Sequence, residues 1–381
     1  LVIFSPNFLI LNIHNTDDSF YYFNIAKNIA SGIGSTFDGI TLTNGYQPLW
    51  LTILVPVYKL VQFDLYAPLK IIISISSLIF SLSIFVLMKI VDDFKIEKEK
   101  KLVITLLFIL FPTLIIFHPR ITFFTWLDGT EFILTFFLLS ILFRIVFNFD
   151  GNKNRDYLIF GFLTGLILLS RTDTILIIFS FPIYLIFISK KFKLNVKNIL
   201  LYGIPVLSMV LPYLVLNYIN FNEFVPVSGQ TKAYWNDIGN TVFGNIFDSF
   251  YRIGISFIHP LEEIIFLKNI NDTFLTKSTI NLFLLTCKVL ISFLFHALII
   301  IWIFNLKKEK KRKILTLIFF TIFFLFHFGY YLKSFGLIET KYWYWSYEYL
   351  IVFFLFAHFV NDIWNKKIYF KCYGKNLLKF T

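Results

Sequence analysis

Long apolar segments, separated by short polar and lysine-rich segments, run through most of this chain. About 20 apolar residues are enough for a helix to cross a bilayer, so the pattern predicts an all-α, multi-pass transmembrane helical bundle. We expect about ten spans. The clearest of them lie at residues 67–91, 102–117, 132–149, 198–217, 282–305, 314–331 and 349–364, and residues 1–13 form a partial one.

Two apolar runs do not fit a single straight span. The run at 157–189 contains the charged triplet "RTD" at 171–173, and one helix of that length would overshoot a membrane core of ~30 Å. We therefore predict two short helices that turn at Arg171–Asp173. The run that starts at "QPLW" contains Pro48 and Pro56, which limit its helix length, and we predict it to be interfacial or re-entrant.

Composition and charge support this interpretation. Only 15% of the 381 residues are charged, whereas a soluble domain would carry about a quarter. The net charge of +12 indicates topology and not nucleic-acid binding, because most Lys and Arg residues fall in loops on one side of the predicted spans. We therefore expect the chain to lie in the plasma membrane with both termini in the cytoplasm.

This topology makes residues 1–381 a single integral membrane domain. The first extracytoplasmic loop, 14–62, is expected to carry juxtamembrane helices. A long extracytoplasmic loop, 219–281, mixes aromatic and polar residues and is expected to form interfacial helices.

The acidic pair Asp17 and Asp18 opens an amphipathic helix in the first outer loop, and Gly32 and Gly34 are expected to end it. One of the two carboxylates could simply cap the helix. A second carboxylate at the membrane interface is costly without a partner, which favours a general base or a ligand of a divalent cation such as Mg²⁺ or Mn²⁺. No ligand spacing requires a metal.

Further charged residues map to the same outer side, and each also has a simpler explanation. Glu131 could cap a helix, Arg171 could form a salt bridge with Asp173, and Lys232 could belong to an ordinary loop. Arg171, Lys232 or Lys341 could instead contact an anionic ligand. Acids and bases gathered at the outer leaflet suit chemistry in which a lipid phosphate leaves with its negative charge.

Several motifs, in order along the chain, resemble those of polytopic membrane glycosyltransferases of the GT-C type. Asp17, Asp18 and Tyr21 resemble the acidic signature of protein mannosyltransferases and of lipid A aminoarabinose transferases. The chain is closer to largely uncharacterised prokaryotic members of that group. The shared motifs are "TNGYxPLW" at 43–50, Gly-x-Glu at 129–131, "RTD" at 171–173 and "PVSGxxK" at 226–232.

The resemblance implies a GT-C-like fold and transfer of a sugar from a polyprenyl-phosphate carrier to a glycan, lipid or protein acceptor on the outer face. It implies that Asp17 is the catalytic base, with Asp18 beside it, and that a nucleotide donor is not needed. Substrate and phosphate contacts are expected from Tyr46, Gln47, Glu131, Arg171, Asp173, Lys232 and Lys341. The expected phosphate contact of Lys341 is based only on its charge and on the side of the membrane to which it maps. The alternative function is a multi-pass transporter or flippase for glycolipid precursors, which would place charges near the bilayer midplane.

Overall fold

A computed structural model describes residues 5–13, 17–61, 64–93, 127–149, 153–178, 196–224 and 226–228. This part of the chain is helical. The helices are α1 (Asn7–Ile13), α2 (Asp17–Ala30), α3 (Pro48–Leu60), α4 (Ala67–Asp93), α6 (Phe132–Asn148), α7 (Asn154–Ser170), the short 3₁₀ helix η3 (Thr172–Leu176) and α9 (Val196–Phe221).

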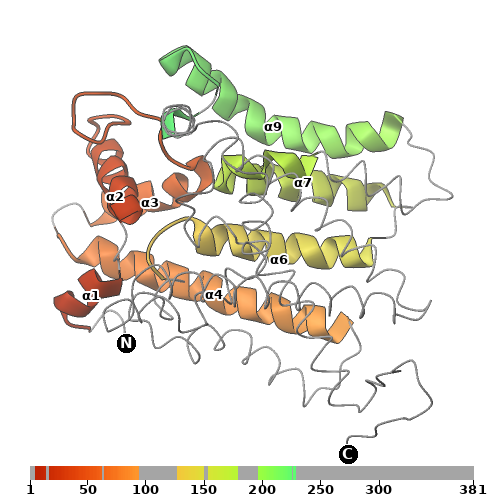
Figure 1. Ribbon diagram of the computed structural model, residues 1–381, viewed down its shortest axis with the longest axis horizontal. Helices are drawn as coiled ribbons and strands as arrows, with labels where there is room; N and C mark the ends of the chain where they lie inside the picture. Colours follow the sequence, from red (N-terminus) through yellow and green to blue (C-terminus); the bar gives the residue numbers. More distant parts are fainter. Residues whose placement is uncertain are drawn as a thin grey trace, which may run out of the picture.

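Four long helices lie side by side as one layer, in the order α4, α6, α7 and α9 (Figure 1). The helices α2 and α3 pack against each other at the end of this layer where α4 and α6 begin and where α7 ends. We call this the outer end of the layer. α3 has 13 residues, or roughly 20 Å, which is shorter than a membrane core.

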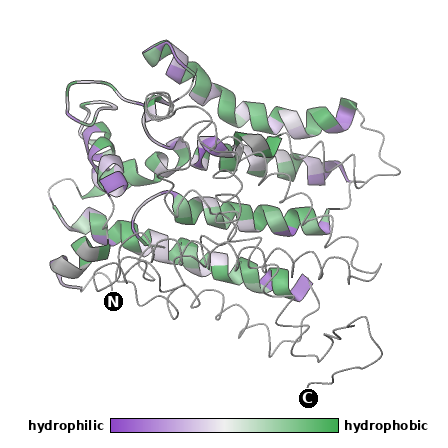
Figure 2. Ribbon diagram, in the orientation of Figure 1, coloured by the Kyte–Doolittle hydropathy of each residue, from purple (hydrophilic) through white to green (hydrophobic). Residues whose placement is uncertain are grey.

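Two of the described helices, α4 and α9, are long and apolar enough to cross a membrane. They have 27 and 26 residues, so each extends roughly 40 Å. On α9 the side chains of Ile204, Leu207 and Ile219 are 59%, 61% and 71% exposed, which is typical of a surface that meets lipid or further apolar helices. Figure 2 shows apolar residues along these helices and hydrophilic residues gathered in α2.

The predicted helices at 67–91, 132–149 and 198–217 are confirmed, as α4, α6 and α9. The predicted break at Arg171 is also confirmed, because α7 ends at Ser170 and η3 follows. The predicted spans at 102–117, 282–305, 314–331 and 349–364, and most of the loop 219–281, lie outside the described residues.

The predicted end of α2 is confirmed in detail. Gly32 has a φ of +78°, in the left-handed region that favours glycine. Its N–H donates to the Ile29 carbonyl at 3.0 Å, and the Ile33 N–H donates to the Asn28 carbonyl at 2.9 Å. This pair of hydrogen bonds is the Schellman motif, which satisfies carbonyls at a helix C-terminus.

Helices α7 and α9 approach each other closely along a glycine face of α7. A Cβ at Gly161 would lie 3.2 Å from the Tyr202 Cα and in severe overlap with the Tyr202 carbonyl oxygen. A Cβ at Gly165 would lie 3.0 Å from the Met209 Cβ. Glycines four residues apart are a common way to bring two membrane helices into contact.

We expect Gly161→Ala to destabilise the protein by about 1–3 kcal/mol, because the α7–α9 contact must open to admit the methyl group. Gly203→Ala is the matched control on α9, where a Cβ would meet no atom within 4 Å. That change should be neutral or stabilising by about 0.5–1 kcal/mol, since alanine favours helix. Thermal unfolding in detergent measures both, and equal effects would contradict the close packing.

Candidate functional site

The acidic pair opens helix α2 at the outer end of the layer. Asp17 and Asp18 occupy its first turn, where carboxylates interact favourably with the free backbone N–H groups. The Asp17 Oδ1 accepts a hydrogen bond from the Asp18 N–H at 3.1 Å, and the Asp17 side chain is otherwise exposed. Asp18 is half-buried. The two carboxylates therefore occupy different surroundings, with Asp17 the more accessible.

The loop before α6 is hydrogen-bonded to both α2 and α3. The Ser19 hydroxyl on α2 donates to the Asp128 carbonyl at 2.6 Å, and the Trp50 indole N–H on α3 donates to the Gly129 carbonyl at 2.8 Å. Gly129 has a φ of +90°, which only glycine adopts easily. This turn carries the chain directly into Glu131, so α2 and α3 fix where Glu131 lies.

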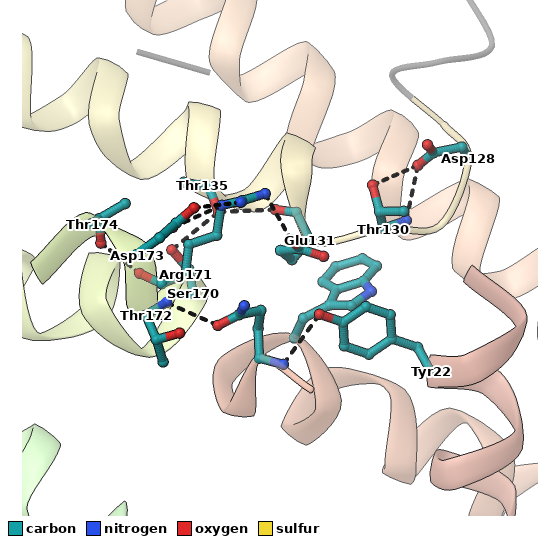
Figure 3. Close-up of polar contacts among 12 residues, drawn as sticks. Tyr22, Asp128, Thr130, Glu131, Thr135, Ser170, Arg171, Thr172, Asp173 and Thr174 are labelled. Carbon is teal, nitrogen blue, oxygen red and sulfur yellow. Dashed lines mark hydrogen bonds and ion pairs between the residues drawn. The ribbon is translucent and has the colours of Figure 1, made fainter. Parts of the chain in front are cut away.

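Arg171 pairs with two carboxylates (Figure 3). Its Nε and Nη2 donate to Oδ1 and Oδ2 of Asp173 at 3.0 and 2.6 Å, and its Nη1 donates to Glu131 Oε1 at 3.0 Å. The Arg171 side chain is only 4% exposed. The salt-bridge alternative for "RTD" is therefore present in the structure, and it extends to Glu131 as well.

Burial and the neighbouring groups have opposite effects on the pKa of Glu131. Burial raises the pKa of its carboxyl above the usual value, and the Arg171 guanidinium and the Tyr22 hydroxyl act in the other direction. The Asp18 carboxylate adds to the rise in the pKa of Glu131.

Gln47 links the loop before α3 to the segment after α7. Its side-chain oxygen accepts a hydrogen bond from the Thr172 N–H at 2.9 Å, and its own N–H donates to the Tyr22 hydroxyl at 3.1 Å. The adjacent Tyr46 instead belongs to the loop, where its hydroxyl accepts from Ser35 at 3.0 Å. Of the two predicted contacts in "TNGYxPLW", Gln47 is the one that reaches the ion pairs.

The structure thus brings together most of the predicted site residues that it describes. Gln47, Glu131, Arg171 and Asp173 form one group that is linked by ion pairs and by the Thr172 backbone, and we call it the outer-end cluster. Asp17 and Asp18 lie in the first turn of α2, and Tyr46 lies in the loop before α3. Lys232 and Lys341 lie outside the described residues.

Sequence reasoning missed three side chains that hold the outer-end cluster in place: Ser19, Tyr22 and Trp50. Trp50 lies within the "TNGYxPLW" motif, which could have singled it out. Tyr22 is one position after Tyr21 and falls on the apolar stripe of α2, so its pattern is that of a core residue. Ser19 gives no comparable signal.

A second motif also contacts the loop before α3. The Asn44 side chain, 0% exposed, accepts a hydrogen bond from the Val227 N–H at 2.8 Å, across 183 residues of sequence. The neighbouring Gly45 lies against Ser228, with a built Cβ 3.8 Å from the Ser228 Cβ. The start of "PVSGxxK" is therefore held against "TNGYxPLW".

This contact can be tested by cross-linking. A Cβ–Cβ separation near 3.8 Å is typical of disulfides, so we expect Gly45→Cys with Ser228→Cys to form one, in a background that lacks Cys287 and Cys372. The matched control is Gly39→Cys with Ser228→Cys, because Gly39 has no atom within 4 Å of its built Cβ. Maleimide–polyethylene glycol counts free thiols after denaturation, with and without reductant. Two free thiols in the first pair would contradict the contact.

The metal alternative at Asp17 and Asp18 receives no further ligand from the described residues. Within them, no group of three or more His, Cys, Asp or Glu side chains is placed to hold a metal ion. A divalent cation at the acidic pair stays an untested prediction.

Comparison with known proteins gives no match. The chain matches no protein-family model, no curated protein and no solved structure. A function for this chain must therefore rest on the chemistry of the outer-end cluster and on the resemblance of the short motifs that meet there.

Proposed function

We propose that this chain is a polytopic membrane glycosyltransferase that moves a sugar from a polyprenyl-phosphate carrier to an acceptor. One observation carries the proposal. Three motifs of the resemblance lie far apart in the sequence and are joined by hydrogen bonds. Trp50 of "TNGYxPLW" donates to the Gly129 carbonyl, and Arg171 of "RTD" donates to Glu131. The acidic pair lies beside this junction, at the start of α2.

In the proposed reaction Asp17 is the general base. Its exposed carboxylate takes the proton of an acceptor hydroxyl while that oxygen attacks the anomeric carbon of the donor sugar. The bond from the anomeric carbon to the phosphate oxygen breaks with its electron pair, and polyprenyl phosphate departs. A single displacement of this kind inverts the anomeric configuration.

The outer-end cluster would support this chemistry by holding together the segments that surround the acidic pair. Arg171 already donates to both Glu131 and Asp173, so we assign it to holding the site together and not to binding the phosphate. The positive charge needed by the leaving phosphate would then come from Lys232 and Lys341. Asp18 is half-buried and adjacent to Asp17, and it would help to set the position of Asp17.

The proposal places the outer end on the extracytoplasmic side of a prokaryotic plasma membrane, with both chain termini in the cytoplasm. The sorting of Lys and Arg to the opposite side of the predicted spans supports this orientation. The exposed apolar faces of α4 and α9 are compatible with a position in the bilayer.

The test separates transfer from transport. Purified protein in proteoliposomes is given undecaprenyl-phosphate hexoses and pentoses, labelled in the sugar, together with lipid, glycan and peptide acceptors. A glycosyltransferase produces sugar-free undecaprenyl phosphate and a labelled acceptor. A flippase moves the labelled lipid between leaflets with its sugar–phosphate bond intact, and that result would contradict the proposal.

A further inference from the structure

The segment 44–50 makes side-chain hydrogen bonds to three parts of the chain that lie far away in the sequence. Trp50 binds the loop before α6, Gln47 binds the segment after α7, and Asn44 binds the segment after α9. The contacts of Trp50 and Gln47 lead to residues of the outer-end cluster. The contact of Asn44 instead holds the start of "PVSGxxK", the motif that ends at Lys232.

Asn44 is buried in a loop that is held by its own hydrogen bonds. The Asn44 backbone carbonyl accepts the Tyr46 N–H at 2.8 Å. The preceding residue, Thr43, is paired with Ser35 twice: its N–H donates to the Ser35 carbonyl at 2.7 Å, and its carbonyl accepts the Ser35 hydroxyl at 2.6 Å. The side-chain oxygen of Asn44 therefore offers a fixed acceptor to the Val227 N–H, which it binds at 2.8 Å.

The segment after α9 is also held by contacts of its own. Asn222 has a φ of +55°, a region that asparagine tolerates better than most residues. Its N–H donates to the Tyr218 carbonyl at 2.9 Å. The Phe224 ring stacks on Tyr218, with centroids 4.9 Å apart, and the buried Asn217 side chain donates to the Phe224 carbonyl at 3.3 Å. The chain therefore approaches Val227 by a defined route.

The contact at Asn44 limits where Lys232 can reach. Ser228 follows Val227 directly and lies against Gly45, whose built Cβ is 3.8 Å from the Ser228 Cβ. Lys232 lies outside the described residues, but it follows Ser228 by four positions, which span at most roughly 14 Å when fully extended. A change in the position of Ser228 would therefore be passed on to the lysine that we assign to the leaving phosphate.

We propose that Asn44 is a positioning residue for sugar transfer, whose side-chain oxygen holds the start of "PVSGxxK" so that Lys232 reaches the phosphate of the donor. The inference rests on the proposed function. Negative charge grows on the phosphate as its bond to the anomeric carbon breaks, and a cation stabilises that charge only from a fixed, close position. Asn44 acts through the Val227 backbone and does not touch the donor itself.

Asn44→Leu keeps a similar volume and removes the acceptor of the Val227 N–H. We expect kcat for release of polyprenyl phosphate to fall about 10- to 100-fold, as for a small misplacement of a reacting group. Lys232→Met, alone and combined with Asn44→Leu, completes a double-mutant cycle. If Asn44 acts through Lys232, the combined loss of kcat is smaller than the product of the two single losses.

Asn198→Leu is the matched control, with the same chemical change at the opposite end of α9. The Asn198 side chain donates to the Tyr157 hydroxyl at 3.2 Å, so it also joins two segments, but it lies far from the outer end. We expect wild-type kcat from this variant. Equal losses from Asn44→Leu and Asn198→Leu would contradict the inference.

A cross-link tests the same role by replacing the lost hydrogen bond. In a chain without Cys287 and Cys372, the disulfide between Gly45→Cys and Ser228→Cys holds the two segments together. With this disulfide, kcat of Asn44→Leu should return to within about threefold of the cross-linked protein that keeps Asn44, because the segment is again held in advance. Reductant should abolish the recovery.

The outcomes separate this inference from the proposed function. An active wild type with an unimpaired Asn44→Leu or Lys232→Met variant contradicts the inference only. So does a loss that matches the fraction of unfolded protein, or a cross-link that does not restore kcat. A cross-linked protein that keeps Asn44 but has no turnover also contradicts it, because the two segments would then have to separate. A wild type that releases no polyprenyl phosphate contradicts the proposed function, and the positioning role falls with it.

Discussion

Replacing Arg171 with methionine is expected to destabilise the protein by about 3–5 kcal/mol, the typical cost of removing one partner from a buried ion pair. The guanidinium is 4% exposed, and its two partners, Glu131 and Asp173, are 7% and 11% exposed at the side chain. Methionine fills a similar volume but leaves two carboxylates without their cation. Thermal unfolding in detergent gives the change in stability.

Two further variants make this result specific. Arg155→Met is the control, because Arg155 is exposed at the other end of α7, where such a change is usually within ±0.5 kcal/mol. Adding Glu131→Gln and Asp173→Asn to Arg171→Met removes the unpaired charges and should recover much of the lost stability. An Arg171→Met protein as stable as Arg155→Met would show that the ion pairs do not hold the outer end together.

Asp17→Asn is expected to lower turnover of the donor lipid by about 10²- to 10⁴-fold, the usual contribution of a general base. Asparagine has the same shape and also serves well at a helix start, but its amide cannot take a proton from the acceptor hydroxyl. The Asp17 side chain is exposed, so stability and membrane insertion should stay at the wild-type level. Release of polyprenyl phosphate measures the turnover.

Asp64→Asn is the matched control for this prediction. Asp64 is an exposed carboxylate just before α4, where it accepts hydrogen bonds from Tyr66 and Ala67, and asparagine can replace it in that role. We expect wild-type turnover from Asp64→Asn and an intermediate loss from Asp18→Asn. Unimpaired turnover in Asp17→Asn would remove Asp17 from the mechanism, and a larger loss in Asp18→Asn would make Asp18 the base.

Local patterns in the sequence predicted the helices and their ends well. Apolar runs gave α4, α6 and α9, Gly32 gave the end of α2, and the charged triplet at Arg171 gave the break after α7. Each of these features depends on residues close together in the chain. A glycine in the left-handed region or a charge within an apolar run acts on its own neighbourhood, so spacing reveals it.

Long-range partners were harder to predict. The Arg171 guanidinium forms ion pairs with both Asp173 and Glu131. Only Asp173 is near Arg171 in the sequence, so only the pair with Asp173 was predicted. Gln47 occupies the variable position of "TNGYxPLW", and nothing in its sequence surroundings indicates that it accepts a hydrogen bond from the Thr172 backbone. Such partnerships depend on which helix ends meet, and periodicity does not encode that.

Tyr22 illustrates a different difficulty. Its ring packs in the core like any apolar residue, and its hydroxyl alone joins the polar network. A tyrosine on an apolar stripe is usually a core residue. Its second role becomes visible only when the Gln47 backbone N–H, from another segment, is placed at its hydroxyl.

The most direct test of the central claim is a cryo-electron microscopy structure of the full chain with an intact polyprenyl-phosphate sugar bound. The account predicts the sugar at the outer end, with its anomeric carbon near Asp17 and room between them for an acceptor hydroxyl. It also predicts that cationic side chains contact the phosphate and that the polyprenyl chain packs against the apolar helices. Donor density at the opposite end of the layer, near Arg144, or a sugar out of reach of both Asp17 and Asp18, would contradict it.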